Sequence, residues 1–93
     1  MNISISELLR NQYLNIIDIR DKHKYLENHI PGAISIEANE LIKNPTIYLE
    51  KMKTYYLYCD SGYRSKIVSQ RLNNMGYRAV NITGGFNNYL LRN

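Results

Sequence analysis

Short apolar or aromatic runs alternate along this chain with segments that carry helix signals, and this alternation constrains the fold more than any other feature of the sequence. Four runs are predicted strands: 14–19, 33–36, 54–58 and 78–82. The first indicates a strand largely buried on both faces, as is typical inside a parallel sheet. Strands that alternate with helices predict an α/β fold, here a small three-layer domain with a central, mostly parallel sheet and helices on both faces.

Helix signals occupy the stretches around these runs. Ser4 and Glu7 have the spacing of a capping box and predict a short helix to about Asn11. Asp21 can cap a short polar helix. In Asn44-Pro45, a capping residue precedes a proline that suits the first position of a helix.

The longest helix is predicted after the third run, from about Ser65 to a C-cap glycine at Gly76. Its apolar residues lie three and four positions apart and form one predicted stripe, which consists of Ile67, Val68, Leu72 and Met75. The pair Gly84-Gly85 predicts a tight turn into a final short helix that carries Phe86, Leu90 and Leu91.

The 93 residues suffice for one domain, which we expect to span the whole chain, 1–93. No apolar run approaches the ~18 residues of a membrane helix. The N-terminal segment lacks the basic and apolar stretches of a secretory signal. These features predict a cytoplasmic protein with no membrane partner.

The net charge of +4 is unevenly distributed. Residues 51–93 carry seven Lys and Arg against Asp60 alone, whereas residues 1–50 carry five Lys and Arg and seven Asp and Glu. The basic half favours an anionic partner. We do not expect nucleic acid, because the basic residues are spaced apart and no stacking or groove motif accompanies them.

Cys59 is the single cysteine of the chain, so it can form no internal disulfide and no second thiol can resolve it once oxidised. With two histidines and no metal-type spacing, neither a metal site nor a cofactor is expected. His29 is interpreted as a hydrogen-bonding turn residue, and Asp18 and Arg20 as a structural pair.

The segment 59–65, Cys-Asp-Ser-Gly-Tyr-Arg-Ser, lies between a predicted strand and a predicted helix. Gly62 allows the chain to curl, and a curled loop ahead of a helix turns backbone N–H groups inward as a nest for negative charge. These donors and the positive end of the helix stabilise a thiolate, the nucleophilic form of Cys59. Arg64 adds a fixed cation. A core cysteine that merely ends a strand is the disfavoured alternative.

This segment resembles the active-site loop of the single-domain rhodanese-like sulfurtransferases. Three more segments agree with that family in order and spacing: Ile17-Asp18-Ile19-Arg20, His29-Ile30-Pro31-Gly32-Ala33, and Gly76-Tyr77 through Ile82-Thr83-Gly84-Gly85. The similarity spans 14–89. Asn28 stands where the family usually has a glycine, which suggests a left-handed backbone that asparagine tolerates. Tyr89 stands where a tryptophan is common, and we expect looser C-terminal packing.

The resemblance implies that Cys59 is the catalytic nucleophile, which takes a sulfane sulfur from an anionic donor such as thiosulfate and holds it as a persulfide. The sulfur then passes to an external acceptor: a small thiol, a protein cysteine or cyanide. The backbone N–H groups of the loop would bind the substrate, with Arg64 as an anion anchor; the loop residues are Asp60, Ser61, Gly62, Tyr63, Arg64 and Ser65. Asp60 has no evident role, because its charge opposes anion binding.

Two other functions remain open. Cysteine-dependent phosphatases and arsenate reductases hold an oxyanion in a similar loop, with five residues between the cysteine and the arginine. Here four residues, 60–63, separate Cys59 from Arg64, and the smaller loop suits a sulfur atom better than a phosphate. A non-catalytic rhodanese-like binding module is the second alternative, although such modules usually lack the cysteine or the loop charge.

Overall fold

Five strands form a single sheet in the computed structural model, which describes residues 1–11 and 14–92. The strand order is β1-β5-β4-β2-β3 and every neighbouring pair is parallel, so the predicted α/β class is confirmed. The strands are β1 (Asn2–Ile3), β2 (Asn15–Asp18), β3 (Ile34–Ser35), β4 (Thr54–Tyr58) and β5 (Arg78–Ile82). The helices are α1 (Ile5–Leu9), α2 (Lys22–Glu27), α3 (Ala38–Lys43), α4 (Pro45–Tyr48), α5 (Tyr63–Asn74) and α6 (Gly85–Leu91).

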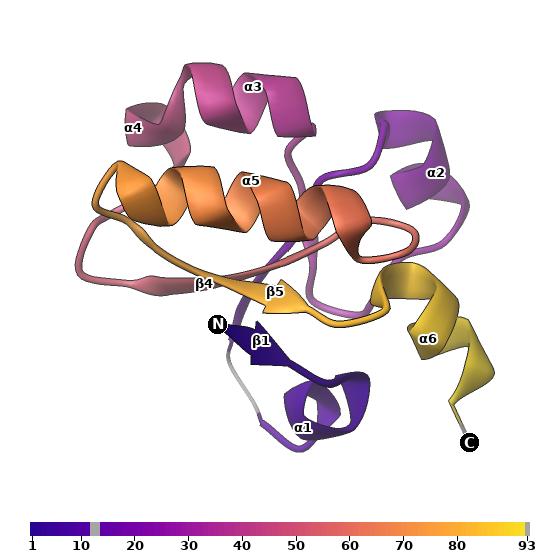
Figure 1. Ribbon diagram of the computed structural model, residues 1–93. Coiled ribbons are helices and arrows are strands. Elements are labelled where there is room, and N and C mark those ends of the chain that lie inside the picture. Colours follow the sequence, from indigo (N-terminus) through magenta and orange to yellow (C-terminus); the bar gives the residue numbers. More distant parts are fainter. Residues whose placement is uncertain (12–13, 93) are drawn as a thin grey trace.

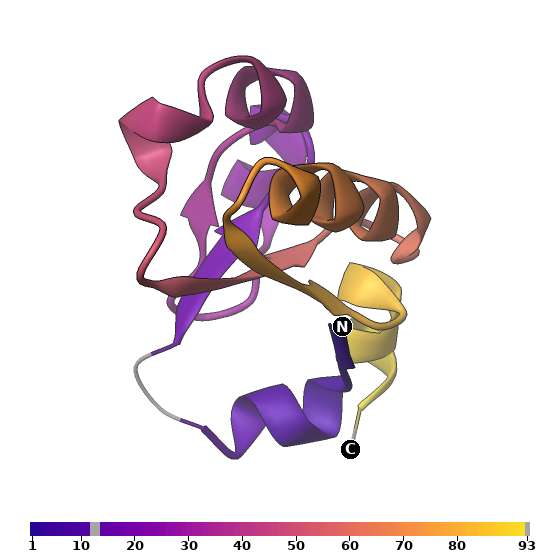
Figure 2. The ribbon, with the colours of Figure 1, turned by 60° about the vertical axis from the view of Figure 1, so that its left-hand side comes forward.

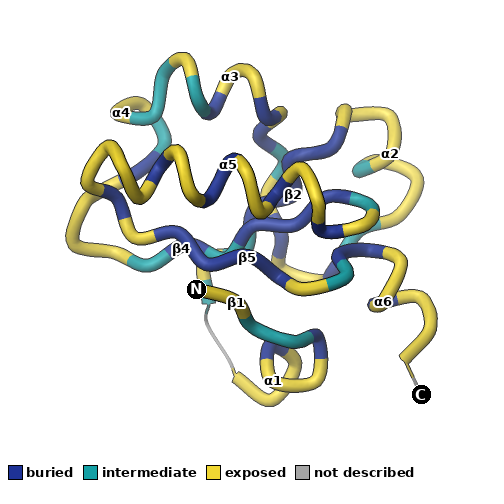
Figure 3. Tube along the Cα trace, viewed as in Figure 1, coloured by how far each residue is buried: buried dark blue, intermediate teal, exposed yellow. Residues whose placement is uncertain are grey.

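Helices cover both faces of the sheet, as the three-layer prediction requires. Figure 1 shows α3, α4 and α5 above the central strands and α1 and α6 below them, and the turned view of Figure 2 agrees. The side chains of β4 alternate between the two sides: Leu57 packs in the core under α3 and α5, whereas Tyr58 packs in the core with α1 and α6. The central strands are accordingly the most deeply buried part of the chain (Figure 3).

The predicted caps form largely as expected. Ser4 Oγ accepts from the Glu7 N–H at 3.1 Å, and an Asp21 carboxylate oxygen accepts from the Lys24 N–H at 3.1 Å. Helix α1 ends at Leu9, two residues earlier than predicted. Pro45 does occupy the first position of α4, but Asn44 makes no side-chain cap. Within the described residues, no helix is both long and apolar enough to cross a membrane.

The apolar stripe predicted for α5 is half wrong. Val68 and Leu72 are buried, whereas Ile67 and Met75 are 42% and 38% exposed. Their places against the sheet are taken by two buried serines, Ser65 and Ser69. Small side chains at these positions let the start of α5 lie close to β4 and β5. Gly76 follows the helix with a φ of +98°, as a C-cap glycine does.

Two elements were not predicted, the edge strand β1 and helix α3. Strand β1 is only two residues long and pairs with the far end of the chain, at Asn81 and Ile82 of β5. Helix α3 buries Ala38 and Leu41 and packs along α5 (Figure 1). Short elements of this kind are defined by their tertiary partners more than by local sequence.

Candidate active site

The strand order creates a crevice at the carboxyl ends of β2 and β4. The chain crosses from β2 to β3 in one direction and from β4 to β5 in the other, so the two crossovers diverge between these strands. Open α/β sheets bind their ligands at such a point. A cavity of about 250 Å³ lies here, lined by Ile19, Arg20, Asp21, Lys24, Cys59, Asp60, Ser61, Tyr63 and Arg64. Five of the seven predicted site residues line it, while Gly62 and Ser65 are buried behind it.

The loop from Cys59 to Gly62 turns β4 into α5. Gly62 has a φ of +93°, a left-handed conformation that favours glycine, and is the N-cap residue of α5. A Cβ on Gly62 would lie 2.8 Å from the backbone N of Gly84, so space as well as conformation excludes a side chain. Helix α5 therefore starts at Tyr63, two residues before the predicted start, and its first turn lies directly over the sulfur.

Three groups contact the sulfur of Cys59. The N–H groups of Gly62 and Ser65 donate to Sγ at 3.2 and 3.3 Å, and the thiol donates to Ser65 Oγ at 3.4 Å. The Ser65 hydroxyl in turn donates to Asn81 Oδ1 on β5 at 2.5 Å. Cys59 is only 6% exposed, but it lines the cavity, so a slender group can reach the sulfur.

Helix α6 orients the peptide groups of the loop from behind. The N–H groups of Phe86 and Asn87 donate to the carbonyls of Cys59 and Asp60, both at 2.9 Å. Because the C=O and N–H of a trans peptide point in opposite directions, the N–H groups of Asp60 and Ser61 are turned away from α6. Neither of them donates to an acceptor among the described residues. The N–H of Tyr63 is instead bound by Ser61 Oγ, at 3.3 Å.

Gly85 makes this close approach of α6 possible. A Cβ on Gly85 would lie 2.3 Å from the carbonyl oxygen of Cys59 and 2.9 Å from that of Asp60. The predicted Gly84-Gly85 turn is confirmed, and it also forms the back wall of the cysteine loop, a contact that no local sequence signal indicates.

The structure explains Asp60, the one loop residue without an evident role in the sequence. Lys24 Nζ lies 2.7 Å from its carboxylate and Arg20 Nη1 lies 3.5 Å from it. Burial raises the pKa of Asp60, but the hydrogen bond and charge of Lys24 and the charge of Arg20 outweigh it and hold the pKa below its usual value of 3.8. The carboxylate thus joins α2 to the loop, and Lys24 and Arg20 compensate its negative charge.

Arg20 belongs to a buried polar network beneath the crevice. Its guanidinium contacts the fully buried Asp18 at 2.7 Å, and Asp18 also accepts the hydroxyl of Tyr58 at 2.7 Å. Burial lowers the pKa of Arg20, yet the hydrogen bond and charge of Asp18 leave it raised overall. Burial raises the pKa of Tyr58, and the hydrogen bond to Asp18 adds to that shift. The Asp18–Arg20 pairing predicted from the sequence is confirmed.

Two cations of the cavity, Arg20 and Lys24, were missed as site residues. Both are committed to Asp60 through contacts that span 40 and 36 residues of sequence. Arg64 also lines the cavity, is exposed, and forms no ion pair within the described part of the chain. It is therefore the cation best placed to attract an incoming anion.

The other predicted residues lie outside this chemistry. His29 Nδ1 hydrogen-bonds the Tyr25 carbonyl at 2.8 Å, as expected for a turn residue. Across residues 1–11 and 14–92, no three His, Cys, Asp or Glu side chains gather closely enough to hold a metal ion. What the arrangement offers chemically is a single sulfur nucleophile held by amides, at the base of a small cavity with a cation at its mouth.

Comparison with known proteins assigns the family. The sequence model of the rhodanese-like domain matches residues 4–92. The chain belongs to the rhodanese-like domain family. It is 34% identical over 70 residues to the thiosulfate sulfurtransferase PspE of Escherichia coli, covering 74% of this chain and 67% of PspE. It is 32% identical over 81 residues to the thiosulfate sulfurtransferase GlpE of Coxiella burnetii, covering 86% of this chain and 75% of GlpE.

Solved structures of the rhodanese fold match this one closely. The crystal structure of SSP1007 from Staphylococcus saprophyticus superposes with a TM-score of 0.85 at 34% identity, covering 95% of this chain and 91% of SSP1007. Other curated relatives are longer proteins, of which this chain spans 43% and 22%. This chain therefore matches only one part of each of those two relatives.

Both departures from the rhodanese pattern behave differently from what the sequence suggested. Asn28 has a φ of −168°, an extended conformation open to any residue, so the expected left-handed backbone is wrong; its carbonyl accepts from Arg20 at 2.7 Å. Tyr89 is only 7% exposed. The centroid of its ring lies 5.6 Å from the ring centroid of Phe86 and 3.7 Å from the guanidinium carbon of Arg92. The expected loosening at Tyr89 is not found.

Proposed function

We propose that this rhodanese-like protein is a sulfurtransferase that moves a sulfane sulfur from thiosulfate, or a related anionic donor, through a persulfide on Cys59 to an external thiol or cyanide. The observation that carries the proposal is the sulfur of Cys59, which accepts two backbone N–H groups at the base of a cavity that Arg64 flanks. The names of PspE and GlpE, both thiosulfate sulfurtransferases, support thiosulfate as the donor.

The first step forms the persulfide. The Cys59 thiolate attacks the outer sulfur of thiosulfate, a new S–S bond forms, and the bond between the two thiosulfate sulfurs breaks with its electron pair leaving on sulfite. The persulfide is an anion, so it needs the same donors as the thiolate. The N–H groups of Gly62 and Ser65 supply them at the sulfur, and those of Asp60 and Ser61 extend the cradle.

The second step returns the enzyme to its starting form. The acceptor thiolate attacks the outer sulfur of the persulfide, and the Cys59–sulfur bond breaks to leave the Cys59 thiolate. Since Cys59 is the only cysteine in the sequence, the acceptor must come from another molecule. The kinetics expected of such a covalent relay are ping-pong.

Arg64 acts as the anion anchor in this proposal. Thiosulfate carries two negative charges, and Arg64 has no ion pair within the described residues. The cavity is small, about 250 Å³, which fits thiosulfate. The four residues between Cys59 and Arg64 form a small loop, which favours a sulfur atom over a phosphate.

The test is the mass of the intact protein after incubation with thiosulfate. We expect the addition of one sulfur atom, its loss on adding cyanide, and the release of thiocyanate. Cys59→Ser should show neither, and retained thiocyanate formation by this variant would refute the proposal. Robust turnover of a phosphate ester would assign the site to a cysteine-dependent phosphatase instead, and absence of both activities would favour a binding module.

A further inference from the structure

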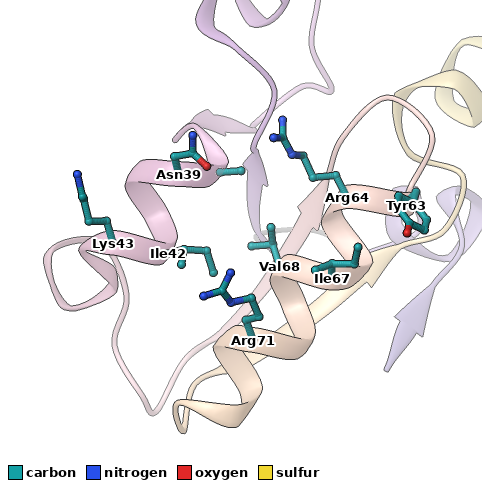
Figure 4. A pocket seen from close by; sticks show the side chains of 9 residues that line it. Asn39, Ile42, Lys43, Tyr63, Arg64, Ile67, Val68 and Arg71 are labelled. Atoms are coloured by element: carbon teal, nitrogen blue, oxygen red, sulfur yellow. The ribbon is translucent and has the colours of Figure 1, made fainter.

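A second and larger cavity adjoins the cysteine site. It has a volume of about 490 Å³ and lies between α3 and α5, and it shares Tyr63 and Arg64 with the cysteine cavity (Figure 4). We call it the α3–α5 groove. Its volume is within the range of small-molecule sites. The cysteine cavity alone accounts for thiosulfate, so the groove has no part in the chemistry described so far.

The floor of the groove is apolar. Ala38 and Ile42 of α3 and Ile67 and Val68 of α5 line it, and Figure 4 shows Ile42 across the groove from Val68. Ile67 is 42% exposed although its spacing predicted a place in the core. An exposed aliphatic side chain on a concave floor is a feature that a bound apolar group would cover.

Cations surround this floor. Lys43, Arg64 and Arg71 line the groove, and in Figure 4 the Arg71 guanidinium is turned toward Ile42. None of the three forms an ion pair with another described residue. Their charge is therefore uncompensated locally and complements an anionic ligand.

The length of the ligand follows from the helix. Arg64 and Arg71 are seven residues apart on α5, which is roughly 10 Å along its axis. The sulfur of Cys59 lies at the Arg64 end, since Arg64 lines both cavities. A molecule whose sulfur reaches Cys59 and whose charge reaches Arg71 must span about this distance over the apolar floor.

We propose that the α3–α5 groove binds the body of the organic thiol that accepts sulfur from Cys59: a slender apolar stem about 10 Å long ending in a carboxylate or phosphate held by Arg71, with Lys43 adding positive charge at the outer edge of α3. This inference rests on the proposed function and specifies its acceptor. Concavity favours a small molecule over a protein surface, because Cys59 is 6% exposed and a broad surface cannot reach it.

The reaction is the second step described above, now with the acceptor thiol held in the α3–α5 groove. The thiolate of the bound acceptor donates its electron pair to the outer sulfur of the persulfide. The S–S bond to Cys59 breaks, the electron pair returns to Cys59 Sγ, and the acceptor leaves as a persulfide. Sulfur and charge balance without an added oxidant or reductant, and the groove contributes only binding and orientation.

The experiment compares acceptors that share one thiol and one stem but differ in the terminal charge. Protein is first loaded with thiosulfate and its persulfide is verified by mass; failure at this stage refutes the proposed function, not the groove. Discharge of the loaded protein is then followed with 8-mercaptooctanoate and with 8-mercaptooctan-1-ol. We expect the carboxylate to react with about tenfold higher kcat/KM.

Three variants locate the effect. In Lys43→Gln/Arg71→Gln, which removes two positive charges, the carboxylate-to-alcohol ratio should fall to about one. In Lys66→Gln, which removes one positive charge on another side of α5, the ratio should stay near ten. Lys66 lines a different cavity, beside Asn81. Using the ratio within each variant cancels differences in loading. In Ile67→Ser both eight-carbon acceptors should bind more weakly, whereas the carboxylate-to-alcohol ratio should stay near ten.

Several results would overturn the inference. One is a ratio near one in the unaltered protein; another is a ratio that the double variant leaves unchanged. A third is a short-chain ratio, for 3-mercaptopropionate against 3-mercaptopropan-1-ol, as large as the ratio for the eight-carbon pair. That result would place the recognition of the negative charge beside the sulfur. A preference shown only by an acidic cysteine peptide would assign the groove to a protein segment instead.

Discussion

Ser65 and Ser69 offer a matched test of what holds the cysteine loop. Both are buried serines of α5, four residues apart on the same face. The Ser65 hydroxyl donates to Asn81 Oδ1 and contacts the sulfur of Cys59. The Ser69 hydroxyl has no hydrogen-bond partner within the described residues. Ser65→Ala and Ser69→Ala therefore remove the same atom, a buried hydroxyl oxygen, from one site where it is hydrogen-bonded and from one site where it is not.

The expected free energies of unfolding follow from these partners. Ser65→Ala leaves Asn81 Oδ1, on a residue only 5% exposed, without that donor, which costs about 1–3 kcal/mol. Ser69→Ala removes an unsatisfied hydroxyl. Both gain about 0.5 kcal/mol of helix propensity, which cancels in the comparison. We expect Ser65→Ala to be destabilised and Ser69→Ala slightly stabilised, with a difference of about 2 kcal/mol.

Urea denaturation at pH 7 measures this difference, and a thermal scan should show it as roughly 8–16 °C in Tm for a domain of this size. Activity provides the second readout. A Cys59 thiolate has no proton to donate, so we expect the Ser65 hydroxyl to turn from Asn81 Oδ1 and donate to the sulfur instead. Loss of this hydrogen bond to a charged sulfur, about 1.5 kcal/mol, should lower kcat/KM for thiosulfate about tenfold in Ser65→Ala only. Two variants equal in stability within about 0.5 kcal/mol, or equal in activity, would refute the reasoning.

Three further predictions concern the crevice. Arg64→Ala should raise KM for thiosulfate about tenfold with kcat changed less than about twofold, measured by thiocyanate formation; an unchanged KM would remove its anchoring role. Tyr58→Phe leaves Asp18 without the hydroxyl donor and should lose about 2–3 kcal/mol in urea, whereas the matched Tyr56→Phe should lose under about 1 kcal/mol; equal losses would contradict the network. Asp60→Asn breaks a half-exposed pair and should cost about 0.5 kcal/mol at pH 7. Since the pKa of Asp60 is lowered on folding, that stability is present above pH 3.8 and is lost as pH falls through the lowered pKa, so a cost that persists in acid would count against the pairing.

The cysteine loop could be predicted because its determinants are contiguous. A strand end, a glycine and a helix start occur within 59–65, and each signal is local. The structure accordingly turns two amides toward the sulfur. The role of Asp60 could not be predicted, because Arg20 and Lys24 reach it only when β2 lies beside β4. Strand order is a property of the whole sheet, and no local signal contains it.

The α5 stripe shows a second limit. Hydrophobicity selected Ile67 and Met75 for the core, whereas the structure buries Ser65 and Ser69. A serine enters the core here because Asn81 of β5 provides a partner for one hydroxyl and because small side chains permit close packing. Neither reason is visible in the spacing of apolar residues. The same displacement leaves Ile67 on the floor of the α3–α5 groove.

The attachment of the loop carbonyls to Phe86 and Asn87 has a consequence for biosynthesis. Cys59 emerges from the ribosome well before the segment that orients its peptide groups. A nascent chain that ends within α5 contains the thiol without the back wall, so it lacks the assembled nucleophile. For the sulfurtransferase proposed above, the loop that binds the sulfur is therefore complete only after translation has passed the double glycine.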